Sequence, residues 1–324
     1  MIRRTVPQKT ISKQISLSGV GLHTGKHVNI TFKPAPADTG LVFVRDDVDG
    51  DNLINAHIKY ISNTDRGTNL DNGLFRIHTS EHVLAAITGL DIDNCFICLD
   101  GPEVPIMDGS SKFFINALEQ AKIVEQNVLR EEFFPSEPIS YLCEDTGSKI
   151  SILPDDNYRV NTIVDYKTRV LGEQEASINH ISEFKKEISS ARTFSFLHEL
   201  ETLLENGLIK GGDLNNAIVY VDKPLAESNM EILKKAFNKE SISVTPNGIL
   251  DNLDLHFPNE AARHKLLDVI GDLALIGMKI RGKVIAEKPG HSINAKFAKK
   301  VSEVIKLDRK LSLIHIWRCR RQAV

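Results

Sequence analysis

Cysteine, aromatic residues and long apolar runs are scarce in this sequence of 324 residues. Its four cysteines are too few for the disulfide framework of a small secreted protein and fit a reducing compartment better. No window approaches the ~18 consecutive apolar residues of a membrane-spanning helix, and the polar N-terminus lacks the apolar stretch of a signal peptide. We therefore expect a cytoplasmic protein without a transmembrane segment.

Positive charge is not in excess either. The formal net charge is -3, and no basic patch is interleaved with aromatic residues in the way that binding to a phosphate backbone requires. Nucleic acid is therefore not an expected partner. The apolar fraction of 41% and the charged fraction of 26% are those of an ordinary globular protein, which excludes a fibrous or disordered chain.

The length favours two domains, because a single hydrophobic core seldom grows beyond ~250–300 residues. Short β-like runs and helices alternate in each half, and the order of elements in the second half resembles that in the first. A charge-dense stretch at 127–132 marks the expected boundary. The sequence predicts an α+β fold of two similar domains, 1–128 and 129–310. Each would be a β-sheet layer packed with helices (β-α-α-β sandwich), with the active site in the cleft between them.

Hydrophobic periodicity locates the expected elements along the chain. Strands are predicted at 10–17, 27–32, 41–44, 94–99, 150–153, 158–165 and 280–286. Helices are predicted at 80–89, 112–121 and 259–276. The first two helices follow Thr79, Ser80, Ser110 and Ser111, whose side chains are expected to cap them.

The last 14 residues, 311–324, differ from the rest of the chain. They contain the only tryptophan, Trp317, and three arginines, and the segment 311–321 resembles the translation of a transposon end used in sequencing libraries. We interpret 311–324 as a non-native tail and exclude it from the predicted fold. A genuine basic tail is the alternative.

The most informative segment is the predicted helix at 259–276. It is apolar on several faces, so we expect it to be buried. His264, Asp268 and Asp272 nevertheless recur every four residues, and at ~3.6 residues per turn they lie along one stripe with Lys265 at its margin. Burying such groups is costly unless they are paired or bind a metal. Surface ion pairs give the same spacing, so this helix alone leaves both interpretations open.

A second group of polar residues falls in the predicted helix at 80–89, where Glu81 and His82 precede an apolar run. His82, His264 and Asp268 together would supply three nitrogen and oxygen ligands, which is the arrangement of a catalytic zinc with an open position for water. Glu81, next to a ligand, would take a proton from that water. The sequence therefore predicts a Zn²⁺ site built from both domains.

Seven short motifs follow one another along the chain. They are Gly19–Gly25 (GVGLHTG), Ser80–His82 (SEH), Pro105–Gly109 (PIMDG), Ala191–Phe194 (ARTF), Gly211–Gly212, Arg263–Asp272 (RHKLLDVIGD) and Lys288–His291 (KPGH). In this order, over nearly all of residues 1–310, the chain resembles the UDP-3-O-acyl-N-acetylglucosamine deacetylases of lipid A biosynthesis. The resemblance implies hydrolysis of the N-acetyl group of UDP-3-O-(3-hydroxyacyl)-N-acetylglucosamine to acetate and a free 2-amino sugar, the committed step of lipopolysaccharide assembly.

The resemblance also implies roles for individual residues. It assigns the zinc ligands to His82, His264 and Asp268, and the general base to Glu81. The other implied roles are a histidine that protonates the leaving amine (His291), its partner carboxylate (Asp272), a hydroxyl donor to the oxyanion (Thr193), a lysine that contacts substrate at the catalytic centre (Lys265), and two further substrate contacts (Phe194 and Gly212).

Two further segments have competing interpretations. The stretch 191–221 is predicted to form strand, helix and strand, and its apolar residues favour a helix docked on the core. In the family that it resembles, the corresponding insert forms a tunnel for the substrate's acyl chain, where each buried methylene is worth ~0.8 kcal/mol. Gly19–Lys26 superficially resembles a phosphate loop but lacks a Ser or Thr after Lys26 and a third loop glycine, so a hairpin turn is predicted. His23 and His78 are expected to be structural or to support the ligands without binding the metal themselves.

The stretch 223–256 is longer and more charged than in the best-known family members and resembles the Bacteroidetes-type subgroup. There the deacetylase is commonly fused to a C-terminal 3-hydroxyacyl-carrier-protein dehydratase, so we expect the native chain to continue beyond Lys310 into such a domain. Two other functions compete. A zinc peptidase lacks support because no HExxH motif is present. A non-catalytic sugar-nucleotide or lipid-binding homologue would be favoured if Glu81 or a ligand were missing, and none is.

Overall fold

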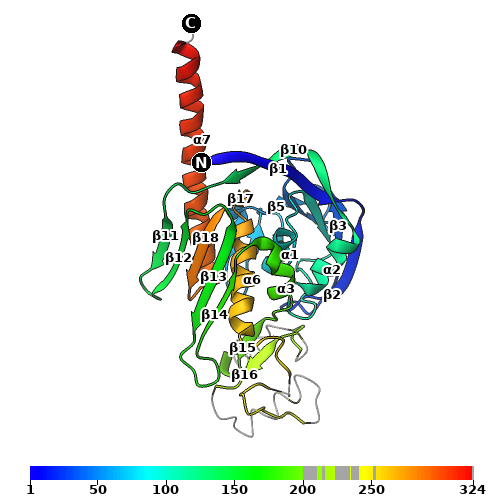
Figure 1. Cartoon of the computed structure of the whole chain (residues 1–324). Coiled ribbons are helices and arrows are strands. Elements are labelled where there is room, and N and C mark those ends of the chain that lie inside the picture. The colour runs from blue at the N-terminus through cyan, green and yellow to red at the C-terminus, as the bar shows by residue number, and fades with distance from the viewer. Residues whose placement is uncertain (200–209, 214–215, 223–233, 235–240, 251–252, 323–324) are drawn as a thin grey trace.

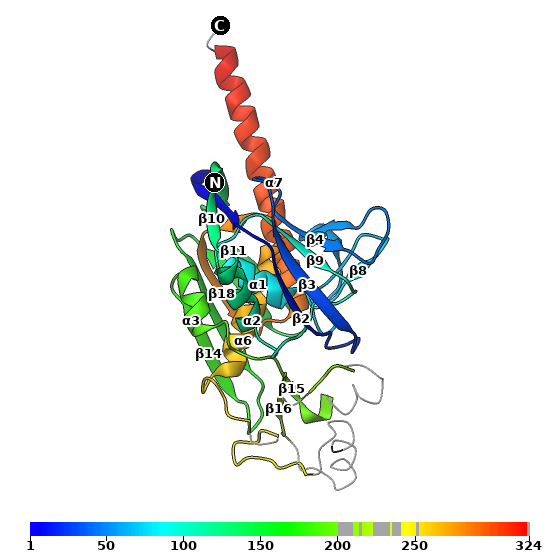
Figure 2. The same ribbon diagram turned by 90° about the vertical axis from the view of Figure 1, so that its right-hand side faces the viewer.

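Two five-stranded sheets enclose a central layer of helices in the computed structural model (Figure 1). The structure describes residues 1–199, 210–213, 216–222, 234, 241–250 and 253–322. The central layer contains α1 (Glu81–Gly89) and α6 (Glu260–Ala274), which pack on each other. Figure 2 shows the same layer from the side, between the strands of the two halves. This arrangement confirms the predicted α+β class.

The two large sheets share one topology. The first has the order β2 (Ile15–Val20), β3 (His27–Pro34), β9 (Cys95–Leu99), β4 (Leu41–Arg45) and β5 (Leu53–Asn55), and the second has the order β11 (Ile139–Cys143), β12 (Ser148–Leu153), β18 (Gly282–Glu287), β13 (Tyr158–Asp165) and β14 (Glu173–Ile178). In each sheet the strand that comes last in the sequence lies at the centre, between two pairs of strands. β9 is antiparallel to β3 and parallel to β4, and β18 is antiparallel to β12 and parallel to β13. The halves therefore repeat one arrangement of strands, as the order of elements predicted.

Burial follows the expected periods. Buried and half-buried residues alternate along the whole of β13, which turns one face of its sheet toward the helices. All nine residues of α1 are buried, as are twelve of the fifteen residues of α6. One continuous apolar core spans both halves of the chain. Polar side chains on α1 and α6 are thereby held away from solvent.

A third sheet joins the two halves. β10 (Ile123–Phe133) pairs with β1 (Ile2–Ile11) on one side and with β17 (Lys279–Ile280) on the other. The expected boundary at 127–132 therefore lies inside a strand and not in a linker. Its charges are dense because they bridge elements: Arg130 Nη2 is 2.8 Å from Asp93 Oδ2, and Glu132 Oε1 is 2.8 Å from Arg281 Nη2. The division into domains 1–128 and 129–310 stays a prediction.

The strand predicted at 10–17 is wrong in its continuity. β1 ends at Ile11 and β2 begins at Ile15. Between them the hydroxyl and the N–H of Ser12 both donate to the carbonyl of Ala121, at the end of α2 (Lys112–Gln120). These bonds turn the chain from the sheet of β10 into the sheet of β3.

The predicted side-chain cap of α1 is wrong, whereas for α2 the hydroxyl of Ser110 accepts a hydrogen bond from the N–H of Lys112, the first residue of the helix, as predicted. Neither Ser80 nor Ser111, the residues at the N-caps, makes a capping hydrogen bond. The hydroxyl of Ser80 donates instead to the carbonyl of Thr68, and the hydroxyl of Ser111 donates to the carbonyl of His82. Both serines therefore tie α1 to neighbouring segments.

The remaining elements flank this framework. They are the small sheet β6 (Ile61–Asn63), β7 (Asn69–Asp71) and β8 (Arg76–Ile77), the short helices η1 (Ile58–Tyr60), η2 (Ile181–Glu183) and α3 (Phe184–Glu187), and the parallel pair β15 (Phe194–Phe196) and β16 (Ile218–Tyr220). The predicted insert at 191–221 thus begins and ends in paired strands, while its residues 200–209 and 214–215 lie outside the described residues.

The last helix, α7 (His291–Gln322), starts in the body of the protein and projects beyond it (Figure 1). It continues through the segment at 311–322 that we interpret as a tail. Within the described part of the chain, no helix combines the length and apolar character that crossing a membrane requires.

Candidate active site

Three potential metal ligands meet where α1 crosses α6. His82 lies in the first turn of α1, and His264 and Asp268 lie one turn apart on α6. Asp268 Oδ1 is 3.4 Å from His264 Nε2 and 3.9 Å from His82 Nε2, and one ligand atom from each residue lies within 4.8 Å of the others. Among the described residues no other group of three such side chains comes together. The helix crossing therefore assembles the predicted ligand set.

The chemistry of this cluster fits a divalent cation. Burial lowers the pKa of His82 to about 3 and also lowers the pKa of His264, so both imidazoles are neutral, which is the form that binds a metal. Asp268 Oδ1 is buried without a hydrogen-bond partner, an arrangement that is rare unless a further group occupies the position. His264 Nδ1 lies 3.1 Å from the carbonyl oxygen of Ala191, the kind of contact that orients metal-binding histidines.

Lys265 controls the charge of Asp268. Burial disfavours the ionised carboxylate, but Lys265 and His264 outweigh burial and hold the pKa of Asp268 below its usual range. Lys265 Nζ is 2.8 Å from Asp268 Oδ2, which leaves Oδ1 facing the two imidazoles. The ammonium also lies 5.5 Å from the centre of the Phe194 ring. Asp268 is therefore the anion that a metal ligand must be.

Glu81 and His291 face each other beside the cluster. His291 Nε2 is 3.8 Å from Glu81 Oε1 and 4.0 Å from Asp268 Oδ2. On the other side of the ring, Nδ1 is 3.0 Å from Asp272 Oδ2. The structure thus brings together six of the predicted residues: Glu81, His82, His264, Asp268, Asp272 and His291.

The pKa values of Glu81 and His291 are both raised above their usual values. Burial raises the pKa of Glu81 to about 7, although the charge of His291 opposes the shift. Burial alone would lower the pKa of His291, but Asp272, Glu81 and Asp268 raise it to about 9. Between these values a carboxylate able to accept a proton stands beside an imidazolium able to donate one. That combination suits general base and general acid catalysis.

Arg192 fixes the segment that carries Thr193 and Phe194. Its Nε is 2.9 Å from Oε1 of Glu260 at the start of α6, and both side chains are buried. The Phe194 ring lies 6.3 Å from the ring of His264, centre to centre. Thr193, which immediately precedes Phe194, is half-buried. This anchor holds two of the predicted substrate-facing residues against α6.

The first motif forms the predicted hairpin turn, because β2 and β3 are antiparallel neighbours. Glu103, which is fully buried, holds this turn: Oε2 accepts hydrogen bonds from the N–H and the hydroxyl of Thr24, and Oε1 accepts from the N–H of His23. Oε1 also accepts from the hydroxyl of Thr79, which has a positive φ of 58° and lies two residues before α1. Glu103 therefore connects the turn to the start of the helix that carries Glu81.

Gly211, the neighbour of the predicted residue Gly212, is joined to this turn, because its N–H donates to the carbonyl of Leu22. The two histidines expected to be structural lie nearby but outside the metal cluster: His23 Nε2 is 3.2 Å from the carbonyl of Arg66, and His78 Nδ1 is 2.8 Å from Oδ1 of Asn69.

Two residues at the site were not predicted. Thr68 donates its hydroxyl to Asp272 Oδ1 over 2.5 Å and its N–H to Glu81 Oε2 over 2.9 Å. Asn294 Nδ2 donates to Asp272 Oδ2 over 2.8 Å. Asn294 lies one turn after His291 on α7, a spacing that would have indicated it once His291 was chosen. Thr68 follows a loop and belongs to no periodic pattern.

The chain matches a protein family described as UDP-3-O-acyl N-acetylglycosamine deacetylase, over residues 8–233 and 226–303. It belongs to this family. It is similar to "Bifunctional enzyme LpxC/FabZ" of Chlorobaculum tepidum, with 44% identity over 301 residues, 92% of this chain and 64% of that protein. The protein of the same name from Bacteroides thetaiotaomicron is 41% identical over 300 residues, 93% of this chain and 65% of that protein.

Shorter family members are covered more completely. "UDP-3-O-acyl-N-acetylglucosamine deacetylase" of Myxococcus xanthus is 38% identical over 296 residues, 91% of this chain and 86% of that protein. The chain thus spans less than two thirds of the two relatives named as bifunctional and most of the relative from Myxococcus xanthus.

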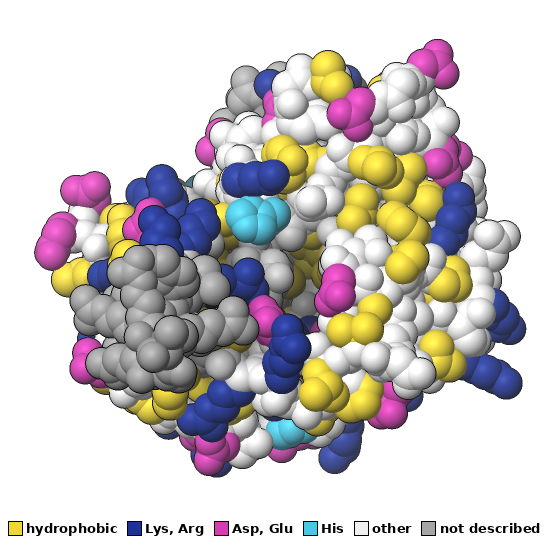
Figure 3. All heavy atoms as spheres, turned by 90° about the horizontal axis from the view of Figure 1, so that it is seen from above, with side chains coloured by type: hydrophobic (Ala, Val, Ile, Leu, Met, Phe, Trp, Pro, Cys, Tyr) yellow, Lys and Arg dark blue, Asp and Glu magenta, His cyan; other side chains and the backbone are white. Residues whose placement is uncertain are grey.

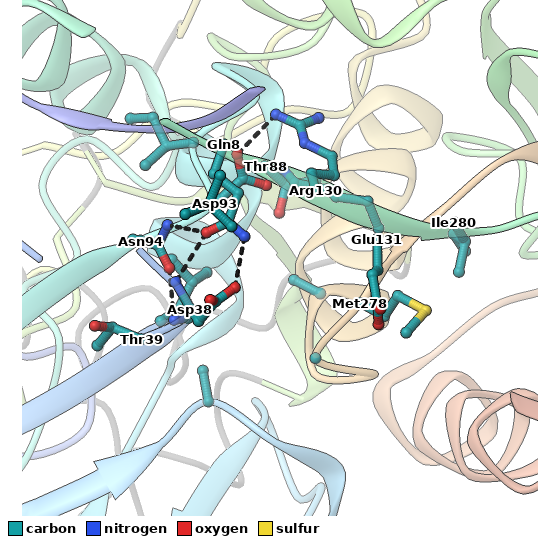
Figure 4. Close-up of a pocket in the computed structure, with 18 of the residues that line it drawn as sticks. Gln8, Asp38, Thr39, Thr88, Asp93, Asn94, Arg130, Glu131, Met278 and Ile280 are labelled. Carbon is teal, nitrogen blue, oxygen red and sulfur yellow. Dashed lines mark hydrogen bonds and ion pairs between the residues drawn. The ribbon is translucent and has the colours of Figure 1, made fainter. Parts of the chain in front are cut away.

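This family member also has a cavity of about 750 Å³ between the β1–β10 ribbon and the ends of α1 and α6. None of the residues of the metal cluster lines it. Figure 4 shows that its polar walls pair with one another: Gln8 bonds to Asp38 and Asn94, and Arg130 bonds to Asp93. The upper face of the molecule is hollowed near its centre, with hydrophobic side chains in the depth (Figure 3). The paired side chains of the cavity wall are thus held by hydrogen bonds and an ion pair to one another.

Proposed function

We propose that this chain is a zinc-dependent deacetylase that removes the acetyl group from UDP-3-O-(3-hydroxyacyl)-N-acetylglucosamine, the committed step of lipid A biosynthesis. The observation that carries the proposal is the buried trio His82, His264 and Asp268 with Glu81 and His291 beside it. Family membership supplies the substrate, because relatives are named for this deacetylation. Amide hydrolysis needs a nucleophilic water, a base, an oxyanion donor and an acid, and the site offers groups for each.

The proposed reaction consumes one water and releases acetate and an amine. When bound by His82, His264 and Asp268, zinc would supply a Lewis acid that polarises a carbonyl oxygen and lowers the pKa of water towards ~7. Glu81 would take the proton from the attacking water at its carboxylate. His291 would donate a proton to the departing amine nitrogen from Nε2, while Asp272 holds Nδ1.

Three other residues are proposed to position the substrate. The hydroxyl of Thr193 would donate to the oxyanion that forms at the acetyl carbonyl. Lys265 and Phe194 lie together at the edge of the cluster, so they would contact the sugar and its carbonyl group. Gly212 and the rest of the 191–221 insert would form the wall for the acyl chain. Its strands β15 and β16 contribute side chains, among them Phe196, to a buried apolar cluster. This cluster supports the binding of an apolar ligand there.

We further propose that the native protein carries a second activity and functions in the cytoplasm. The three relatives with identities of 41–44% are named as bifunctional enzymes and are longer than this chain. The family resemblance makes the second part a 3-hydroxyacyl-carrier-protein dehydratase. Sequencing the locus past Lys310 tests this, and a stop codon immediately after that position would contradict it.

Acetate release from UDP-3-O-acyl-N-acetylglucosamine tests the proposed function. We expect turnover by the wild type, loss of turnover with a chelator, and recovery when zinc is added back. Glu81→Ala should lower kcat by roughly 10²–10⁴-fold, the usual contribution of a general base. Glu303→Ala, which removes an exposed carboxylate on α7, is the matched control and should retain wild-type turnover. Full activity after zinc removal, or in Glu81→Ala, would disprove the mechanism. A Glu81→Ala protein that binds substrate, paired with an inactive wild type, would favour a non-catalytic binding protein.

A further inference from the structure

Thr68 touches both halves of the acid and base machinery. It is fully buried and immediately precedes β7. Its N–H donates to Glu81 Oε2 over 2.9 Å, and its hydroxyl donates to Asp272 Oδ1 over 2.5 Å. Its carbonyl in turn accepts hydrogen bonds from the hydroxyl and the N–H of Ser80, directly before α1. Every polar group of this residue is therefore engaged at the site.

The contacts of Asp272 show what the hydroxyl adds. Oδ2 accepts from Asn294 Nδ2 over 2.8 Å and faces His291 Nδ1 at 3.0 Å. Oδ1 accepts from the hydroxyl of Thr68, whose oxygen also lies 3.4 Å from His291 Nδ1. A planar carboxylate that is bound at both oxygens has one orientation, and the imidazole bonded to it shares that orientation. Without the hydroxyl, Oδ1 would lose this partner, and the carboxylate of Asp272 would be less restrained against rotation about its Cβ–Cγ bond.

The position of His291 gives this orientation a catalytic consequence. Its side chain is partly exposed, so packing alone restrains it less than the ligands on α6 are restrained. Its Nε2 must stay within reach of the reacting nitrogen and close to Glu81, from which it is 3.8 Å away. A rotation of the ring about Nδ1 would displace Nε2, because that atom lies across the ring from the pivot.

We propose that Thr68 is a positioning residue: its hydroxyl fixes Asp272 and, through Asp272, the ring of His291, while its N–H fixes the carboxylate of Glu81. This inference rests on the proposed deacetylase function of the same site. It also accounts for a buried hydroxyl that bonds to a residue 204 positions away in the chain. Thr68 would thus fix the positions of the proton acceptor, Glu81, and the proton donor, His291, relative to each other.

The test compares Thr68→Val, which keeps the shape and loses the hydroxyl, with Thr68→Ser, which keeps the hydroxyl. We expect Thr68→Val to lower kcat by about 10- to 100-fold, the factor that corresponds to one hydrogen bond to a charged group, with KM little changed. Thr68→Ser should restore most of kcat. Thr162→Val is the matched control, because Thr162 is equally buried on β13 but its hydroxyl has no hydrogen-bond partner. It should leave kcat unchanged.

The background of His291→Ala separates positioning from general packing. If Thr68 acts through His291, Thr68→Val should cause little further loss in that background, whereas independent effects would multiply. Zinc content and melting temperature, measured on each purified protein, should match the relevant parent. Full additivity of the two substitutions, or a Thr68→Val protein with wild-type kcat, would overturn the proposal. So would a loss of kcat that Thr68→Ser does not restore.

A spectroscopic measurement keeps this inference distinct from the proposed function. The proton on Nδ1 of His291, bonded to Asp272, should give a low-field imidazole resonance in the wild type. We expect that resonance to broaden or move in Thr68→Val and to persist in Thr162→Val. A wild type without deacetylase activity would refute the function, and the resonance would still decide the role of Thr68. An unchanged resonance in Thr68→Val would refute the positioning role in an active enzyme.

Discussion

Replacing Gly271 by alanine tests whether the close approach of α1 and α6 sets the geometry of the site. A Cβ built on Gly271 would lie 2.1 Å from the carbonyl oxygen of Glu81 and 2.8 Å from its carbonyl carbon. Both atoms belong to the backbone, so no side-chain rotation relieves the contact. The helices must move apart by about 1 Å to reach the 3.0 Å that real Cβ atoms keep.

Two opposing effects decide the result. Alanine is favoured over glycine inside a helix by ~1 kcal/mol, whereas overpacking a close contact costs ~1–3 kcal/mol. We expect packing to win, so Gly271→Ala should lower the free energy of unfolding by up to ~2 kcal/mol. The effect on turnover should be larger, because Glu81 and His82 move with α1 while Asp268 stays on α6, and a misplacement of 1 Å can cost ~10²-fold in rate.

Urea unfolding and acetate release measure the two effects on the same preparations. Gly172→Ala is the control, since a Cβ there meets only the carbonyl oxygen of Thr168 at 3.9 Å. It should keep wild-type turnover. A folded Gly271→Ala protein with wild-type kcat would refute the claim that this helix contact positions the site.

Three further outcomes are expected. Turnover should increase with pH through about 7, where Glu81 loses its proton, and fall through about 9, where His291 loses its proton, so a profile that is flat across this range would contradict the assigned roles. Removing the metal should lower the melting temperature, since an ion present at 1,000 times its Kd stabilises the fold by about 4 kcal/mol. The variant His264→Ala should show the same melting temperature with and without zinc. Glu103→Gln should reduce the free energy of unfolding by about 1–3 kcal/mol, because an amide nitrogen replaces an acceptor that faces hydrogen-bond donors, and an equal loss in the exposed-site control Glu303→Gln would remove the support for this reason.

The ligand set could be predicted because it conflicts with its surroundings. His264 and Asp268 share a helical face inside an otherwise apolar segment, and a polar stripe in a buried helix has few explanations. Glu81 and His82 give the same signal at the start of α1. Spacing within each helix fixes the relative positions of His264 and Asp268 and of Glu81 and His82, and the two signals together indicated the site that neither helix indicated alone. His291 came from the family resemblance alone.

The contributions that could not be predicted depend on contacts between distant segments. Thr68 is a single threonine in a polar stretch, and its role appears only when β7 is placed against α6. That the charge-dense stretch at 127–132 lies inside a strand could not be predicted for a related reason. Arg130 and Glu132 look like solvated linker residues in the sequence, yet they pair with partners on other elements inside a strand. Sequence composition cannot distinguish a charge that faces water from a charge that faces its counterion.

The position of strand β10 has a consequence for how the protein unfolds. It hydrogen-bonds to β1 from the beginning of the chain and to β17 from near its end, and one apolar core lies beneath both halves. Neither half can therefore lose its structure without exposing the other. The two copies of the repeated topology are expected to melt in a single cooperative transition, and a chain cut at residue 128 should regain the crossing of α1 and α6 only when both fragments are refolded together.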